Sequence, residues 1–306
     1  ANDKTMRPRI RFPEGYEFAI MCRGNWNVIE GFDIAGANSS EWDQSAALWQ
    51  DCDNLVIRDC FFHHNTKAIG TTRTAGSILI EFCEFDSNGS PPTRHTVDIW
   101  SCESELAKAT VQYCFFHDAT YGALLKSHCT RNVVRYNWFE NGYNMVVAIV
   151  DSPASKPVEM TLGDPWYPMH TDIVGNVFHQ GWSPGPRYAI LSLGGEHATT
   201  PGTEGDFHIA HNLFVTTNGG ISPAVPLLIN GNVDRVRVYN NVFLEYGVTG
   251  CHVYMRGSAW KSPRTRQFVK RRGTDEPSKE GANNWISDRA IGVPDEFLNS
   301  VRGSNP

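Results

Sequence analysis

The chain has 306 residues and a formal net charge of −6, with 33 acidic against 27 basic side chains. A weakly acidic chain of this length builds one large domain or two ordinary ones, and it has no overall positive field that would recruit nucleic acid. The longest apolar run, residues 145–150, is much too short to cross a bilayer. Residues 1–11 are polar, so we expect that any leader has been removed or that the chain is part of a longer product. The eight cysteines do not settle the compartment, and we predict a secreted or extracytoplasmic location.

In chain order, the dominant feature is a seven-residue pattern that recurs through most of the sequence. Each copy has a β-branched residue second, a phenylalanine, cysteine or asparagine fifth, and a phenylalanine or isoleucine last. The copies read VIEGFDI, VIRDCFF, LIEFCEF, TVQYCFF, VVRYNWF, DIVGNVF, HIAHNLF and RVYNNVF. No helical period fits these apolar clusters, which are short and bounded by Asn, Gly, Asp or Thr.

Each copy is predicted to be a strand with one inward residue, then a bend, then an inward phenylalanine. One such strand cannot bury that face alone, whereas stacked copies place like on like in an Ile/Val, a Cys/Asn and a Phe column. Side-chain amides can bond along such a stack, and Cys60, Cys83 and Cys114 fill it as small buried residues. The pattern therefore predicts an all-β fold, a single right-handed parallel β-helix of about eight or more coils with long corner loops.

A second set of nearly continuous apolar segments follows the heptads, as is typical of parallel strands that cover a core. These segments are residues 46–51, 97–101, 123–127, 146–152, 189–193, 227–230 and 252–255. The repeat ends near there, so we predict a β-helix over residues 1–256 and an irregular C-terminal extension over residues 257–306. The alternative folds, a β-sandwich or a propeller, would show more polar alternation and more Asn-Gly hairpin turns.

The stretch LLKSHCTRNVVRYNWF, with VVAIVDSP, DIVGNVFHQG and ILSLGGE, resembles the pectate-lyase-like superfamily of right-handed β-helices, in particular bacterial members. The same stretch is similar to the alginate and chondroitin lyase family, where a Lys-Ser before an Arg-Tyr-Asn strand supplies the catalytic lysine. That resemblance implies an enzyme acting on polysaccharide, with Lys126 as its base. Two departures weigh against it: VVAIVDSP lacks the partner arginine of those lyases, and the spacing from Lys126 to Arg135 looks longer.

Aligning the second set of strands on their serines stacks Trp100, Lys126 and Asp151 in one column, with Cα atoms about 5 Å apart. Lys126 is then the candidate base, and His128 a second base or acid. Trp100 would stack on a sugar, and Asp151 would hold the lysine or bind a cation, for which Ca²⁺ is the candidate. The alternative is an ordinary surface ladder in which Lys126 lies along Trp100 and pairs with Asp151. If these side chains are buried under a loop, the enzyme interpretation loses its main support.

Further substrate-binding residues are predicted on loops and neighbouring coils. Arg187, Glu196 and Arg256 are candidate ligands of the substrate. Trp166 and Tyr167 lie in a loop long enough to wall a groove for an extended polysaccharide.

A column of outward polar residues follows the phenylalanines and consists of His63, Asp86, His117, Glu140 and His179. The candidate metal ligands in and beside it are His63, His64, His117 and Asp118. These side chain types can bind a metal, but the spacing matches no compact ligand motif, so we assign no metal ligands. A routine polar corner of the β-helix is the preferred interpretation.

The leading hypothesis is a polysaccharide lyase that cleaves an acidic, uronic-acid polymer by β-elimination. The alternative is a non-catalytic β-helix that binds glycan or forms part of a surface or phage-like assembly. A third is a glycoside hydrolase that uses two of Asp98, Asp118, Glu140 and Asp151, about 5 to 10 Å apart. The predicted partner is polysaccharide, with no nucleic acid and no membrane span, and the oligomeric state stays open.

Overall fold

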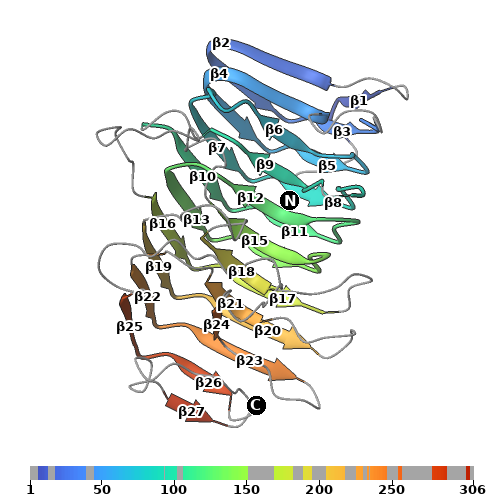
Figure 1. Cartoon of the computed structure of the whole chain (residues 1–306). Helices are drawn as coiled ribbons and strands as arrows, with labels where there is room; N and C mark the ends of the chain where they lie inside the picture. Colours follow the sequence, from blue (N-terminus) through green and yellow to red (C-terminus); the bar gives the residue numbers. More distant parts are fainter. Residues whose placement is uncertain are drawn as a thin grey trace.

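The structure is a computed structural model that describes residues 6–12, 18–38, 45–92, 94–101, 106–150, 169–181, 189–194, 205–217, 225–229, 233, 235–246, 254–256, 278–287 and 301–303. The regular elements in these ranges are β-strands, which pair in parallel and stack in coils (Figure 1). No described residues form a helix that is long and apolar enough to cross a membrane. The predicted all-β parallel β-helix is therefore confirmed.

One sheet forms the first face of the coils, and within the described ranges it holds 11 strands. Most of these strands are short, with three residues each. They are β1 (Arg9–Arg11), β3 (Asp33–Ala35), β5 (Phe61–His63), β8 (Glu84–Asp86), β11 (Phe115–His117), β14 (Trp138–Glu140), β17 (Val177–Gln180), β20 (Leu213–Thr217), β23 (Val242–Tyr246), β26 (Trp285–Ser287) and β27 (Val301–Gly303).

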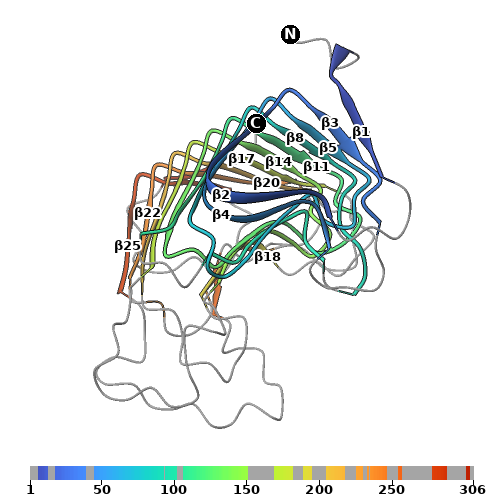
Figure 2. The same ribbon diagram turned by 90° about the horizontal axis from the view of Figure 1, so that it is seen from above.

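The other sheet supplies the remaining two faces, and the long strands β2 (Phe18–Glu30) and β4 (Ala46–Arg58) run through both of them. Seen from above, the coils lie over one another around a common interior (Figure 2). The second face holds β7 (Ser77–Glu81), β10 (Lys108–Gln112), β13 (Arg131–Arg135), β16 (Met169–Val174), β19 (Gly205–Ala210), β22 (Arg235–Tyr239) and β25 (Ser278–Ala282). The third face holds β6 (Ile69–Thr71), β9 (Val97–Ile99), β12 (Ala123–Ser127), β15 (Met145–Ile149), β18 (Ala189–Leu193), β21 (Val225–Ile229) and β24 (Tyr254–Arg256).

The inward columns predicted from the heptads are present. The second heptad position runs in register from Ile29 to Val238, and the last position from Ile34 to Phe243. The phenylalanine rings stack from coil to coil with centroids 4.4 to 5.3 Å apart. Each buried ring stabilises the fold by about 1.5 to 3 kcal/mol, and the column belongs to one continuous hydrophobic core.

The fifth heptad position lines the bend between the second and first faces. Cys60, Cys83 and Cys114 are buried free thiols there, as predicted. Burial raises the pKa of Cys83 well above its usual value, which disfavours the reactive thiolate form. In later coils an asparagine takes the place, and each side-chain amide donates to the next, for example Asn176 to Asn212 at 3.0 Å.

Two features of the stack differ from the prediction. β6 is a strand of the third face that the apolar pattern does not reveal, because only three residues, Ile69–Thr71, pair there. The stack also continues beyond the predicted end at residue 256. β25 and β26 add a coil in which Asn284 accepts from Asn241 at 3.1 Å and Ile286 fills the inward position of the phenylalanine column.

Candidate functional site

The predicted site residues that the structure describes lie on the third face, but in a different register from the prediction. Lys126 on β12 pairs with Asp98 on β9 and with Ala148 on β15. The predicted column of Trp100, Lys126 and Asp151 is therefore wrong. The serine of β12 aligns with Ile99 and Ile149 rather than with other serines, because the preceding loops differ in length.

Alternation along the strands decides which side chains leave the core. Leu125 and its neighbours in register, Val97 and Val147, point inward and join the hydrophobic core. Asp98 and Lys126 are therefore on the outer side of the third face. The outer side is itself covered at this level, because Lys126 is only 5% exposed.

A buried ion pair forms the centre of the site. The ammonium group of Lys67 lies 2.9 Å from Oδ2 of Asp98, and both side chains are buried. The same ammonium group lies 5.9 Å from the ring centroid of Trp49, whose indole lies over Gly70. A Cβ atom at residue 70 would lie 2.4 Å from that indole, so only glycine leaves room for it.

Asp98 is ionised. Burial alone would raise its pKa, but the charge of Lys67, followed by electrostatic interactions with three more side chains, lowers the pKa well below its usual range. These three are His95, Lys126 and His128. The second carboxylate oxygen, Oδ1, is buried and makes no hydrogen bond among the described groups.

Trp100 is the point where this buried cluster meets the surface. Its half-buried indole stacks on the ring of His128 at 4.1 Å. The ammonium group of Lys126 lies 5.8 Å from the indole centroid, and the guanidinium of the exposed Arg73 lies 5.7 Å from it. Cations at these distances from an aromatic ring are attracted to its face. We call Arg73, Trp100, Lys126, His128 and Asp98 the Trp100 cluster.

Of the side chains whose burial under a loop would remove the main support for the enzyme interpretation, Lys126 is buried and Trp100 is half-buried. Lys126 and His128 do lie together under Trp100, as the sequence suggested. Sequence reasoning missed Lys67, Arg73 and the pairing of Asp98 with lysine. The signal for Asp98 was a carboxylate in the otherwise apolar segment TVDIW, where only a paired charge is tolerated.

The remaining predicted residues stay predictions. Asp151, Trp166, Tyr167, Arg187 and Glu196 lie outside the described residues. Arg256 is the last residue of β24, where its backbone pairs with Ile229, and its side chain is outside the description.

The outward polar column on the first face contains one group that could hold a metal ion. Ligand atoms of Asp86, His117 and Asp118 lie within 4.8 Å of one another. Both imidazole nitrogens are already engaged, with Glu84 at 3.3 Å and Asp118 at 2.9 Å. Burial acts to lower the pKa of His117, but the neighbouring carboxylates outweigh burial and raise the pKa above its usual value. A raised pKa favours the imidazolium form, which has no lone pair for a metal ion.

The glycoside hydrolase hypothesis finds little support in the described carboxylates. Asp98 belongs to the third face, whereas Asp118 and Glu140 lie at the first face. The pKa of Asp118 is lowered, because hydrogen bonds from His117 and Asn141 outweigh its burial. The lowered pKa values of Asp98 and Asp118 favour their carboxylate forms, which do not donate the proton that glycoside cleavage needs.

Comparison with known families agrees with this fold. A family model described as a right handed beta helix region matches residues 13–161. The protein is thus a right-handed parallel β-helix, and the predicted fold class is confirmed in its handedness as well. No curated protein sequence matches the chain significantly.

Among solved structures, the chain is similar to tailspike proteins of the E. coli bacteriophage HK620. One tailspike mutant superposes with a TM-score of 0.52 at 13% identity, over 97% of this chain and 64% of the tailspike. A double mutant gives a TM-score of 0.49 at 13% identity, over 98% of this chain and 60% of that protein. The chain thus spans a little over half of the tailspike length, and at this identity the likeness concerns the fold alone.

Proposed function

We propose that this chain is a polysaccharide-binding β-helix that holds an acidic sugar at the third face, over the Trp100 cluster. The observation that carries the proposal is that Arg73, Lys126 and His128 all lie against the indole of Trp100. A ring that packs on the apolar face of a sugar, beside cations that attract its carboxylate, suits a uronic acid. Such polymers are met outside the cytoplasm, so the proposal includes a secreted or extracytoplasmic location.

Within this proposal, the geometry favours binding over cleavage. A polymer approaching the third face would meet Arg73 and the accessible part of Trp100 first. Lys126 lies beneath them, buried and next to the ionised Asp98. A base must come within hydrogen-bond reach of the proton that it removes, and Lys126 is covered.

Cleavage by β-elimination is the second candidate, because Lys126 and His128 form an amine and imidazole pair beside one aromatic ring. Lys126 would take the proton from C5 of a uronate, the C4–O bond would break as the C4–C5 double bond forms, and His128 would protonate the leaving oxygen. This candidate also includes the residues that the sequence predicts around the substrate. Asp151 would hold the lysine, and the substrate-binding residues would be Arg187, Glu196, Arg256, Trp166 and Tyr167.

A Ca²⁺ ion does not fit the described part of this site. Calcium takes about 6 to 8 oxygen ligands. The described side chains around Lys126 offer the carboxylate of Asp98 together with the ammonium group of Lys67. No step is therefore assigned to a cation.

The test is titration calorimetry with alginate, polygalacturonate and chondroitin, together with ultraviolet absorbance for an unsaturated product, with and without chelator. The variants are Arg73→Ala, Trp100→Ala and Lys126→Ala. Lys108→Ala, an exposed lysine on β10, is the matched control. We expect Arg73→Ala and Trp100→Ala to weaken binding of one polymer by about tenfold, with flat absorbance throughout.

A rising absorbance that Lys126→Ala abolishes would replace binding with the lyase candidate. The proposal fails if the folded protein binds none of the polymers. It also fails if Arg73→Ala and Trp100→Ala bind as tightly as the Lys108→Ala control.

A further inference from the structure

A row of exposed aromatic rings lies at the bend between the second and first faces, away from the Trp100 cluster. Phe82, Tyr113 and Tyr136 occupy the fourth heptad position of three consecutive coils and are 53%, 47% and 49% exposed. Their rings stack at 5.2 Å between Phe82 and Tyr113 and at 5.4 Å between Tyr113 and Tyr136. The row thus forms an aromatic strip that crosses three coils.

The backbone at these three positions is one that bulky residues avoid. Phe82, Tyr113 and Tyr136 have φ angles of 55°, 54° and 58°, in the left-handed region. Glycine, asparagine and aspartate adopt this region most readily, and aromatic residues rarely do. The other coils have small or polar residues at this position, namely Gly31, Asp59, Gly175, His211, Asn240 and Asn283. Strain that is accepted in three adjacent coils, each exposing a ring, indicates a functional surface.

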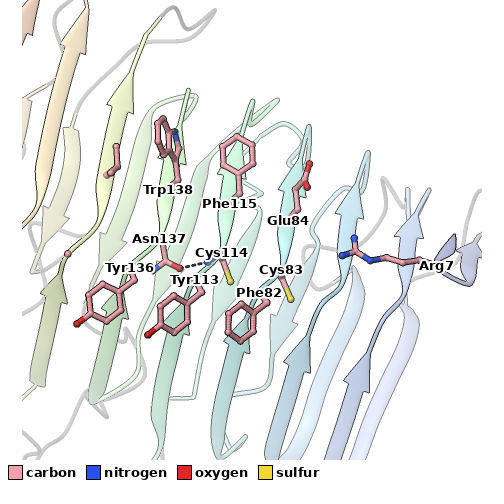
Figure 3. Close-up of a pocket in the computed structure, with 12 residues that line it drawn as sticks. Arg7, Phe82, Cys83, Glu84, Tyr113, Cys114, Phe115, Tyr136, Asn137 and Trp138 are labelled. Carbon is pink, nitrogen blue, oxygen red and sulfur yellow. Dashed lines mark hydrogen bonds between the residues drawn. The ribbon is translucent and has the colours of Figure 1, made fainter. Parts of the chain in front are cut away.

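A second row of side chains faces the first across the bend. Phe115 and Trp138 are neighbours in register at the sixth heptad position, and Trp138 is 48% exposed. The indole nitrogen of Trp138 donates to Glu140 at 3.2 Å, which orients the ring. Between the two rows, Cys83, Cys114 and Asn137 line the floor of an open groove (Figure 3).

Both ends of the groove are defined. At one end, Arg7 lines the groove and is held by Asp59 at 2.6 Å. At the other end is Gly175, where a Cβ atom would lie 2.7 Å from the ring of Tyr136. The space between them has a volume of about 540 Å³, which is in the range of small-molecule sites.

We infer that this aromatic groove is a second glycan-binding site, which takes a neutral, extended sugar chain lying across the coils. Rings that recur once per coil, about 4.8 Å apart, offer apolar surface to successive sugar units, and the two tyrosine hydroxyls meet hydroxyl groups at the rim. This inference does not depend on the Trp100 cluster, which lies on a different face.

Few charged side chains line the groove, and beside it the guanidinium of Arg135 lies 6.0 Å from the ring centroid of Tyr136. Among the described lining residues the charged ones are Arg7 and Glu84. Arg7 is paired with Asp59, and Glu84 with His117 at 3.3 Å. Stacking rather than ion pairing then carries recognition, so binding should change little with salt, in contrast to an acidic polymer at the third face.

The experiment is titration calorimetry of the whole chain with soluble β-glucan, xylan and mannan at low and high salt, with light scattering in parallel. The variants are Trp138→Ala and Tyr113→Asn, since asparagine suits the left-handed bend and keeps the fold. Trp26→Ala, a 73% exposed tryptophan on β2, is the control for loss of an exposed ring. We expect both groove variants to bind at least about tenfold more weakly than the wild type. Trp26→Ala and Lys126→Ala should bind the neutral polymers as tightly as the wild type.

Three outcomes would overturn the inference. The folded chain could bind none of the neutral polymers, or both groove variants could bind them like the wild type. Self-association that Trp138→Ala abolishes would make the groove a protein interface instead. Because Lys126→Ala and Arg73→Ala affect only the third face, failure at the groove is distinguishable from failure of the proposed function.

Discussion

At the residue scale, the asparagine column shows how buried polar groups are satisfied inside a solenoid. The amide of Asn212 donates to Asn241 at 3.0 Å, to the carbonyl of Ile173 at 2.8 Å and to that of Ala210 at 3.0 Å. Its oxygen accepts from the side chain and the backbone of Asn176. In the early coils, the thiol of Cys60 contacts two carbonyls in the same way, at 3.2 and 3.7 Å.

Replacing Asn212 by alanine should therefore lower the free energy of unfolding by about 2 to 4 kcal/mol, because buried donors and acceptors above and below lose their partner. Asn212→Cys should cost less, since cysteine fills the equivalent place in the early coils. Urea denaturation followed by circular dichroism measures both. Equal stability of Asn212→Ala and the wild type would mean that the ladder contributes nothing to stability.

At the element scale, the bend between the second and first faces sets where each strand pair begins. Gly175 has a φ of 69° and lies against the ring of Tyr136. Gly31 occupies the same heptad position with a φ of 78° but has open space around it. The two glycines separate the cost of the left-handed backbone from the cost of a steric clash.

Gly175→Ala should destabilise the fold by about 1 to 3 kcal/mol and displace the Tyr136 ring, because both costs apply there. Gly31→Ala should cost about 1 kcal/mol or less, because only the backbone term applies. Thermal unfolding of both variants measures the difference in stability, and a crystal structure of Gly175→Ala shows whether the Tyr136 ring has moved. A similar loss of stability in the two variants would show that the Tyr136 ring moves away from the new methyl group without a measurable free-energy penalty.

At the scale of the whole molecule, histidines and carboxylates alternate along the outer column of the first face. His63 pairs with Asp33 at 2.9 Å, His117 with Asp118 at 2.9 Å and Glu84 at 3.3 Å, and His179 with Glu140 at 3.3 Å. Burial tends to lower the pKa of His117, but the surrounding carboxylates raise it above its usual value. The folded chain therefore binds this proton more tightly than the unfolded chain does.

The contribution of His117 to stability should accordingly be complete below about pH 6.5, its usual pKa, and should be lost as pH rises through the raised value. His117→Gln should remove this part of the pH dependence of the free energy of unfolding. His208→Gln is the control, because His208 pairs with one exposed carboxylate, Asp172. Denaturation at pH values from 5 to 9, that is about two units on either side of neutrality, tests this. An unchanged pH profile in His117→Gln would contradict the assignment.

The sequence predicts the stack well because its signal repeats in every coil. Inward positions such as Ile80 and Phe116 lie in the columns that the heptads define. The third face carries no such repeat, and the loops that precede its strands vary in length. The register that places Lys126 beside Asp98 could therefore not be predicted from the sequence. The aromatic residues that form the groove are found in the heptads LIEFCEF, TVQYCFF and VVRYNWF. The groove was missed because its rings meet only once the strands are stacked.

The strands keep a constant register although the loops differ in length, so positions along the axis of the β-helix are evenly spaced. Phe82 and Tyr136 are separated by 54 positions in the chain (136 − 82), yet the ring of Tyr113 spans the gap between theirs. Distance along the axis counts coils, not residues, at about 4.8 Å per coil. A loop can therefore gain or lose residues without moving a ring along the axis, whereas deleting one coil would shorten the aromatic strip by one ring spacing.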